Sequence, residues 1–412
     1  MGSTKPDFEP DFLAVIDRGE NTSLMEPLIL SSSCADRPEL MDLAFELAAK
    51  SAALRTRLPN GVHSAVADLV RKMNCYYSNL IEGHNTHPID IERALNNDYS
   101  HDKEKRDLQL EAKAHVIVQA WIDGGGVSGR SGREDAILEI HRRFCENLPE
   151  DLLWVEDPST GSRVALEPGR MRTRDVEIGR HVAISPGAVP RFLNRYEQVY
   201  SNLGSSEMVL ATAAVHHRLL WIHPFTDGNG RVARLVSYAQ LLDKLNTGSI
   251  WSVARGLARS EADYKQHLMN CDRQRQGDLD GRGNLSEEAL ARFTKYFLLT
   301  CLDQVNFMDS LVQPDRLRER ILSWAQEESK IDKLLPNASA ILEAVLYRGE
   351  LPRSDVPRII GLGERQARRV VAGLVQRGVL VAASDRAPLR LAFPAALASR
   401  WMPGLFPDAP ET

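Results

Sequence analysis

The chain has 412 residues, of which 43% are hydrophobic and 26% are charged, and it carries a formal net charge of −5. This composition is typical of a globular protein and excludes a collagen-like or intrinsically disordered chain. The length predicts roughly two or three domains. The slightly acidic balance argues against a protein that coats nucleic acid through its bulk charge.

The cysteines and the apolar segments indicate a cytoplasmic protein that makes no membrane contact. The N-terminal MGSTKPDFEPDF is acidic and lacks the apolar core of a signal peptide. No apolar run approaches the ~18 residues that a membrane-spanning helix requires. The cysteines are widely spaced and form no C-x-x-C pair, which favours reduced thiols over disulfides or a zinc site. They are Cys34, Cys75, Cys145, Cys271 and Cys301.

Helical periodicity dominates the chain after residues 1–36, which are proline-containing and aperiodic and predict an extended arm. Residues 38–57 and 61–82 repeat apolar side chains at three- and four-residue steps, as amphipathic helices do. Gly83 then follows as a natural stop. We therefore expect an all-α fold. Further helices are predicted at 88–95, 103–123, 134–147, 188–203, 206–222, 229–246, 260–271 and 286–310.

Residues 170–186 break this helical pattern. Apolar residues alternate on either side of Gly179-Arg180, which predicts a β-hairpin. A lone hairpin in a helical domain cannot form a sheet core, so we expect a surface flap. The alternating residues are Val176, Ile178, Val182 and Ile184.

The C-terminal part, residues 337–412, has its own charge and its own pattern. It holds ten arginines, no lysine and seven acidic residues, a net +3 that leaves −8 for the remainder. Its predicted order is helix 338–348, helix 353–360, a glycine turn, helix 364–377 and an apolar hairpin, which is the order of a winged helix-turn-helix.

The third helix of this part offers a candidate DNA contact. Arg365, Arg368 and Arg369 lie near its N-terminal half, where such a helix meets a groove. Two interpretations stay open: DNA contact through these arginines, or a protein-interaction module with a solvated arginine face.

The segment HPFTDGNGRVAR, residues 223–234, carries the chemistry. Pro224 discourages continuation of the preceding helix. Gly228 and Gly230 permit a positive φ and close approach by a ligand. Because a helical pattern resumes at once, the loop gathers unpaired N–H groups at a helix start, which is an anion site that phosphate typically occupies.

The side chains of this segment complement such a site. Arg231 and Arg234 share a helix face and can grip successive phosphates. Asp227 is a hard carboxylate suited to Mg²⁺. His223 can take a proton from a hydroxyl near neutral pH. Asn229 can cap the helix or bond a phosphate oxygen.

Two other nucleotide or metal chemistries are disfavoured. The Walker pattern G-x-x-x-x-G-K-[ST] is absent, which argues against a P-loop ATPase. A zinc hydrolase that uses His216, His217 or His223 is a weaker alternative, because no H-E-x-x-H or comparable ligand set exists. The adjacent His216-His217 pair is better explained by packing.

HPFTDGNGRVAR is similar, at every defined position, to the Fic family signature HPFx(D/E)GN(G/K)RxxR. The resemblance covers roughly residues 37–310. It implies a Fic-type helical bundle with a β-hairpin flap, which transfers AMP from ATP to a Tyr, Thr or Ser hydroxyl of a target protein or of the chain itself. The implied division is an arm (1–36), a helical region with an inhibitory helix (37–130), a catalytic core (131–310), a linker helix (311–336) and a winged helix-turn-helix domain (337–412).

The resemblance also implies a role for each matching residue. His223 would be the base and Asp227 the Mg²⁺ ligand. The target would dock along the 170–186 flap by adding a strand, and relatives often form homodimers. Residues implied to hold the nucleotide or its loop are Phe225, Thr226, Gly228, Asn229, Gly230, Arg231, Arg234 and Tyr264, with the stretch 277–284 near the nucleoside.

A second motif lies at the end of the second predicted helix. Ser78 and Glu82 are four residues apart and share a face, and Gly83 follows. Alone, Glu82 is a solvent-exposed helix-terminal glutamate. The sequence SNLIEG matches the family's inhibitory pattern [ST]-x-x-x-E-[GN], which implies that Glu82 pairs with Arg234 and competes with the γ-phosphate of ATP.

Two other classes of function remain open. The chain is a nucleotide-sensing transcription regulator if the winged helix carries the function. It is a Fic relative of different chemistry if it removes AMP or transfers UMP, phosphocholine or phosphate. The intact set of Asp227, Asn229, Arg231 and Arg234 favours a nucleoside triphosphate as the substrate.

Overall fold

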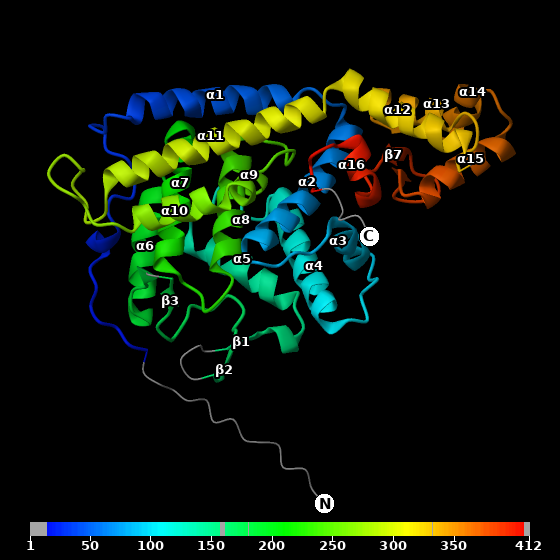
Figure 1. Ribbon diagram of the computed structural model, residues 1–412. Coiled ribbons are helices and arrows are strands. Elements are labelled where there is room, and N and C mark those ends of the chain that lie inside the picture. The colour runs from blue at the N-terminus through cyan, green and yellow to red at the C-terminus, as the bar shows by residue number, and fades with distance from the viewer. Residues whose placement is uncertain (1–14, 157–160, 180, 332, 408–412) are drawn as a thin grey trace, which may run out of the picture.

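The computed structural model describes residues 15–407 except 157–160, 180 and 332. The predicted all-α class is confirmed, and most predicted helices appear within a few residues of their expected bounds (Figure 1). The helices of the body are α1 (Arg37–Arg55), α2 (Asn60–Ile81), α3 (Pro88–Leu95), α4 (Lys103–Asp123), α5 (Glu134–Glu146), α6 (Val189–Tyr200), α7 (Ser205–Ile222), α8 (Asn229–Leu245), α9 (Ala254–Arg259), α10 (Glu261–Cys271), α11 (Glu287–Leu311) and α12 (Pro314–Lys330).

The pair α7 and α8 forms the centre of the body. Almost every residue of α7 from Met208 onward is buried, and so is most of α8 from Asn229 to Leu241. A helix that is buried on all sides belongs in the middle of a bundle. The long helices α1 and α11 run side by side along one side of the body, while α2, α4 and α5 pack nearer the other (Figure 1).

The predicted flap is present as a short hairpin. Strands β3 (Glu177–Ile178) and β4 (His181–Val182) pair antiparallel, and Ile178 lies opposite His181. Arg180, at the predicted turn, lies outside the described residues. A second hairpin, β1 (Trp154–Glu156) with β2 (Arg163–Ala165), was not predicted, because three-residue strands leave too short an alternation to recognise.

The N-terminal arm is packed onto the body along its described part, residues 15–36. It contains a short 3₁₀ turn, Thr22–Met25, whose Met25 side chain is fully buried. Leu28 and Leu30 are also buried. The arm is therefore part of the hydrophobic core, and its first fourteen residues lie outside the described part of the chain.

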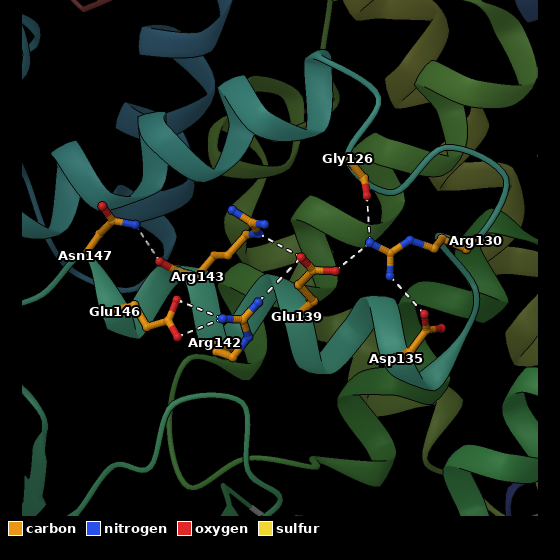
Figure 2. A network of polar contacts seen from close by, with 8 residues as sticks. All are labelled: Gly126, Arg130, Asp135, Glu139, Arg142, Arg143, Glu146 and Asn147. Carbon is orange, nitrogen blue, oxygen red and sulfur yellow. Dashed lines mark hydrogen bonds and ion pairs between the residues drawn. The ribbon is translucent and has the colours of Figure 1, made fainter.

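A charged network holds the loop between α4 and α5 onto α5 (Figure 2). Arg130 donates to the carbonyl oxygen of Gly126 at 2.7 Å and to the carboxylates of Asp135 and Glu139 at 2.9 and 2.5 Å. Glu139 also accepts from Arg143 at 2.9 Å. Such partly exposed pairs contribute little stability individually. Together they fix the start of α5, the helix that packs beneath the candidate site.

The C-terminal part has the predicted element order. Its helices and strands are α13 (Ala338–Arg348), β5 (Glu350–Leu351), α14 (Val356–Ile360), α15 (Glu364–Gln376), β6 (Leu380–Val381), β7 (Leu389–Leu391) and α16 (Ala398–Trp401). The strands form an antiparallel sheet in the order β5-β7-β6, in which β5 is an addition to the prediction. The predicted inner face of α15 is buried: Ala367, Val370, Val371 and Leu374.

The last described residues return to the body and pack on α2. The hydroxyl of Tyr77 donates to the carbonyl oxygen of Leu405 at 3.1 Å. The guanidinium of Arg255 donates to the carbonyl oxygen of Gly404 at 2.8 Å, and the rings of Tyr76 and Phe406 meet edge to face. The helix α2 therefore contacts other helices of the body, among them α4, α8 and α9, and also the C-terminal segment.

Two further features of the described chain are the state of its cysteines and the character of its helices. All five cysteines lie in the described part of the chain and all are free thiols. Among the described residues, none of the helices combines the length and the apolar character that crossing a bilayer demands.

Candidate active site

The loop between α7 and α8 is held in a strained conformation. His223 ends α7 in the left-handed region, with φ 50° and ψ 64°. Gly228 precedes α8 with φ 80°, which a glycine adopts without penalty. For a histidine this region costs about 1–3 kcal/mol, so the surrounding contacts must hold it there.

Asn229 and Phe225 hold the shape of the loop. The Oδ1 atom of Asn229 accepts from the backbone N–H of Phe225 at 2.9 Å, and its Nδ2 donates to the carbonyl oxygen of Phe225 at 2.8 Å. The Phe225 ring is buried and stacks on His141 of α5 at a centroid distance of 3.9 Å. Asn229 is the first residue of α8 and makes no side-chain cap. Both polar atoms of its side chain serve the loop, whereas the sequence indicated a cap or a phosphate ligand.

The imidazole of His223 is neutral and keeps one ring nitrogen unprotonated. Its Nδ1 atom lies 3.2 Å from the carbonyl oxygen of Leu220, which can only accept, so the proton is on Nδ1 and the lone pair on Nε2. Burial lowers the pKa of His223 to about 4. The ring is therefore neutral at pH 7, and it lines the cavity described next.

A cavity of about 1180 Å³ lies between the flap, the loop and α10. A volume of this order accommodates a ligand larger than a typical drug molecule. It brings together five of the predicted site residues, namely Glu82, His223, Gly230, Arg234 and Tyr264, with Ile178, Gly179, His181 and Val182 of the flap. Other predicted residues are described but do not line it: Ser78, Gly83, Phe225, Thr226, Asp227, Gly228, Asn229 and Arg231.

Arg234 is a buried cation fixed by the end of α2. Its Nε donates to the hydroxyl of Ser78 at 2.9 Å, and its Nη2 donates to the Ser78 carbonyl oxygen at 3.0 Å. The same Nη2 donates to the Glu82 carboxylate. The contact that the resemblance implied between Glu82 and Arg234 is therefore present.

The Glu82 carboxylate lies at the start of α8, where the sequence indicated a phosphate. A Cβ atom added to Gly230 would lie 2.3 Å from Oε1 of Glu82, so a side chain at this position would force the carboxylate to shift. Burial acts to raise the pKa of Glu82, but Arg234 outweighs it and holds the pKa below its ordinary value. Gly83, with φ 86°, lets the chain turn away after α2.

Arg231 contacts α4 and α5 at the helix start. Its guanidinium lies 5.1 Å from the ring centroid of Phe144, and its Nη1 is 3.6 Å from Oε2 of Glu111 on α4. The same oxygen of Glu111 lies 2.7 Å from Nδ1 of His84, and this hydrogen bond raises the pKa of His84. Glu111 and His84 were not predicted, because nothing in a helical pattern indicates which distant arginine a glutamate will meet.

The carboxylate of Asp227 is chemically suited to be a ligand of Mg²⁺. It is exposed in the loop that precedes α8. No group of three or more His, Cys, Asp or Glu side chains in the described part of the chain is arranged to hold a metal. Mg²⁺ commonly uses one or two carboxylates together with substrate phosphates and water, so a single Asp227 beside a nucleotide site is compatible with it.

The adjacent histidines of α7 serve packing. His216 hydrogen-bonds the hydroxyl groups of Ser237 and Tyr264 at 2.9 and 2.6 Å. His217 lies 3.0 Å from Asp272 and accepts from Arg218. Tyr264 is thus buried with its hydroxyl occupied, although it borders the cavity. None of the residues 277–284, all of which the structure describes, lines the cavity, and the expected nucleoside contact of that stretch stays a prediction.

Comparison with known proteins shows which family the region around the loop is similar to. Residues 131–241 match the model of the Fic/DOC family. The protein adenylyltransferase Fic of Drosophila willistoni is 29% identical over 233 residues, which are 54% of this chain and 43% of that protein. The protein of the same name from Drosophila ananassae is 28% identical over 191 residues, which are 44% of this chain and 35% of that protein.

These matches span less than half the length of either curated relative. Among solved structures, a Fic family protein from Desulfovibrio desulfuricans G20 aligns with a TM-score of 0.47 and 17% identity. The alignment covers 85% of this chain and 96% of that one.

Proposed function

We propose, on the premise that residues 131–241 of this chain are a Fic domain, that the protein is an adenylyltransferase. It transfers AMP from ATP to a hydroxyl side chain of a target protein or of itself, and Glu82 holds it inactive. The observation that carries the proposal is the joint placement of His223, Gly230, Arg234 and Glu82 on one cavity. The adenylyltransferase name of the similar Drosophila proteins supports AMP as the transferred group.

The chemistry follows from the positions of these groups. The target hydroxyl oxygen attacks the α-phosphorus of ATP, and the bond from that phosphorus to the bridging oxygen of the β-phosphate breaks, so that pyrophosphate leaves. His223 accepts the hydroxyl proton on Nε2. The reaction depends on positioning and charge neutralisation more than on covalent help from the protein. Mg²⁺ held at Asp227 would neutralise phosphate charge.

The start of α8 binds the phosphates in this proposal. Its unpaired backbone N–H groups and the helix dipole favour an anion there. Arg234 then receives the γ-phosphate, and Arg231 turns from Glu111 towards the inner phosphates. The target lies along the edge of the flap hairpin, where β3 and β4 offer backbone hydrogen bonds to an added strand.

Glu82 inhibits by competition. Its carboxylate already occupies Arg234 and the space against Gly230, so a γ-phosphate meets an occupied cation and a like charge. ATP is then bound weakly or with its α-phosphate misplaced. Removing the carboxylate frees both the arginine and the helix start.

The decisive experiment compares the full-length protein with Glu82→Gly and with Glu82→Gly/His223→Ala, each incubated with ATP and Mg²⁺. We expect Glu82→Gly to gain AMP on itself, detected by intact-mass spectrometry, roughly 5- to 150-fold faster than wild type, the usual range of coupling between two sites. The double variant should gain none. Equal labelling of wild type and Glu82→Gly would remove the inhibitory role, and a gain of UMP or phosphate from the matching nucleotide would change the transferred group.

The C-terminal module supports a second, compatible proposal: it binds DNA. Arg365, Arg368 and Arg369 are all exposed on α15, whose opposite face packs into the module. Of these, Arg368 pairs with Glu364 on the same helix. Arg365 and Arg369 are the side chains that we assign to phosphate contact.

A further inference from the structure

Arg172 is a buried arginine that the sequence pattern did not single out. It precedes the flap, and only 3% of its surface is exposed. The described hydrogen bonds of its guanidinium all go to backbone carbonyl oxygens, and none of the described residues forms an ion pair with it. Burying a charged group costs free energy unless polar partners surround it, so its retention calls for an explanation.

The carbonyl partners of Arg172 belong to two segments, the end of α7 and the flap. Its Nε donates to the carbonyl oxygen of His223 at 2.7 Å, and its own backbone N–H donates to that of Pro224 at 2.9 Å. Its Nη1 donates to Arg174 at 2.9 Å and its Nη2 to Ile184 at 2.5 Å. Arg174 precedes β3 and Ile184 follows β4, so one guanidinium joins both roots of the flap to the corner that presents the base.

We propose that Arg172 is a positioning residue for His223 and for the flap, a role that rests on the proposed AMP transfer. The left-handed backbone of His223 is unfavourable for a residue with a side chain, and Pro224 restricts how it can relax. Arg172 ties down the two carbonyl groups that flank this bend. The base and the strand edge that receives the target are thereby held in a fixed position relative to each other.

The positive charge of Arg172 also acts at the end of α7, next to His223. The carbonyl groups of Ile222 and His223 are at the C-terminal end of α7, where the helix dipole favours a cation. Burial lowers the pKa of Arg172 to about 10, which still leaves it protonated at pH 7. Its positive charge also disfavours a second cation on His223, which keeps the imidazole in the neutral form that accepts a proton.

The test uses the full-length Glu82→Gly protein as parent and adds Arg172→Gln or Arg172→Lys. A matched control is Arg170→Gln, which removes a largely exposed arginine two residues earlier in the same segment. For each variant, kcat and KM for ATP are measured by AMP incorporation, and hydrogen exchange is followed over 174–184 and 219–225. Far-ultraviolet circular dichroism establishes that each variant is folded.

We expect Arg172→Gln to lower kcat by about 100-fold, the effect of misplacing a reacting group by roughly 1 Å. The KM for ATP should change less than threefold, because Arg234 and the start of α8 are untouched. Hydrogen exchange should accelerate in both segments together. Arg172→Lys, which keeps the charge but reaches fewer carbonyls, should fall between the parent and Arg172→Gln, and Arg170→Gln should match the parent.

Two results would overturn the assignment: unchanged kcat in a folded Arg172→Gln, or unchanged hydrogen exchange in both segments. If Arg172→Gln does not fold, Arg172→Lys decides in the same way. If the Glu82→Gly parent transfers no AMP, the proposed function fails by itself. Hydrogen exchange still tests whether Arg172 joins the flap to the base, because this measurement does not depend on enzymatic turnover.

Discussion

At the scale of single residues, Gly230 and Glu82 are closely packed against each other. A Cβ atom at position 230 would meet the Glu82 carboxylate at 2.3 Å, and the next neighbour, Nη1 of Arg234, at 3.2 Å. The absence of a side chain at position 230 therefore leaves room for the Glu82 carboxylate in its observed place. This geometry can be tested without any measurement of activity.

We predict that Gly230→Ala lowers the free energy of unfolding of the wild-type protein by about 1–3 kcal/mol, as overpacking typically does. The same substitution should cost much less in a Glu82→Gly background, because the clashing carboxylate is gone. Denaturant unfolding of the four proteins gives the coupling as a double-mutant cycle. An equal cost in both backgrounds would mean that the carboxylate does not lie against Gly230 in solution.

Single residues also show which parts of the candidate site can be predicted from the sequence. His223, Gly230 and Arg234 could be grouped from the sequence because they lie within one short motif, and all three line one cavity in the structure. The same motif predicted a cap or a phosphate contact for Asn229, and in the structure its side chain hydrogen-bonds the backbone of Phe225. Glu111, His84 and Arg172 act on the motif from separate segments. Their importance depends on contacts between distant parts of the chain, which no local pattern encodes.

At the scale of secondary-structure elements, α2 links the inhibitory contact to the C-terminal segment. Its last turn holds Ser78 against Arg234, and the residue directly before it, Tyr77, donates to the carbonyl oxygen of Leu405. The helices themselves were predictable because their apolar periodicity extends over many residues. The docking of the C-terminal segment on α2 was not, since it joins residues more than 300 positions apart.

We predict that loosening this docking weakens inhibition. Tyr77→Phe removes the hydrogen bond to Leu405 while keeping the buried ring, so the end of α2 becomes freer to move away from Arg234. Self-labelling with AMP should rise several-fold over wild type, and the rise should vanish in a Glu82→Gly background, where no inhibition remains to be lost. Tyr99→Phe, on an exposed hydroxyl near the start of α4, is a suitable control. Labelling that rises equally in both backgrounds would assign the effect to something other than α2.

At the scale of the whole molecule, charge is divided between the two parts of the chain. The C-terminal 337–412 carries a net +3 within a protein of net −5. The module faces away from the flap end of the body (Figure 1), so a partner on α15 and a target at the flap would not compete for space. The same module contacts α2 through β7, which places it beside the helix that precedes Glu82.

We predict that the full-length protein binds duplex DNA in a salt-dependent manner through Arg365 and Arg369. If each neutralises one phosphate, the double substitution to alanine should reduce the slope of log K against log salt concentration by about 1.8. Arg292→Ala/Lys295→Ala removes two cations from α11 in the body and therefore matches the change in net charge. Fluorescence anisotropy with a labelled duplex, read over a salt series, measures the slopes. Equal slopes for the double variant and wild type would mean that α15 makes no DNA contact, and the exposed arginines would then belong to a surface for another protein.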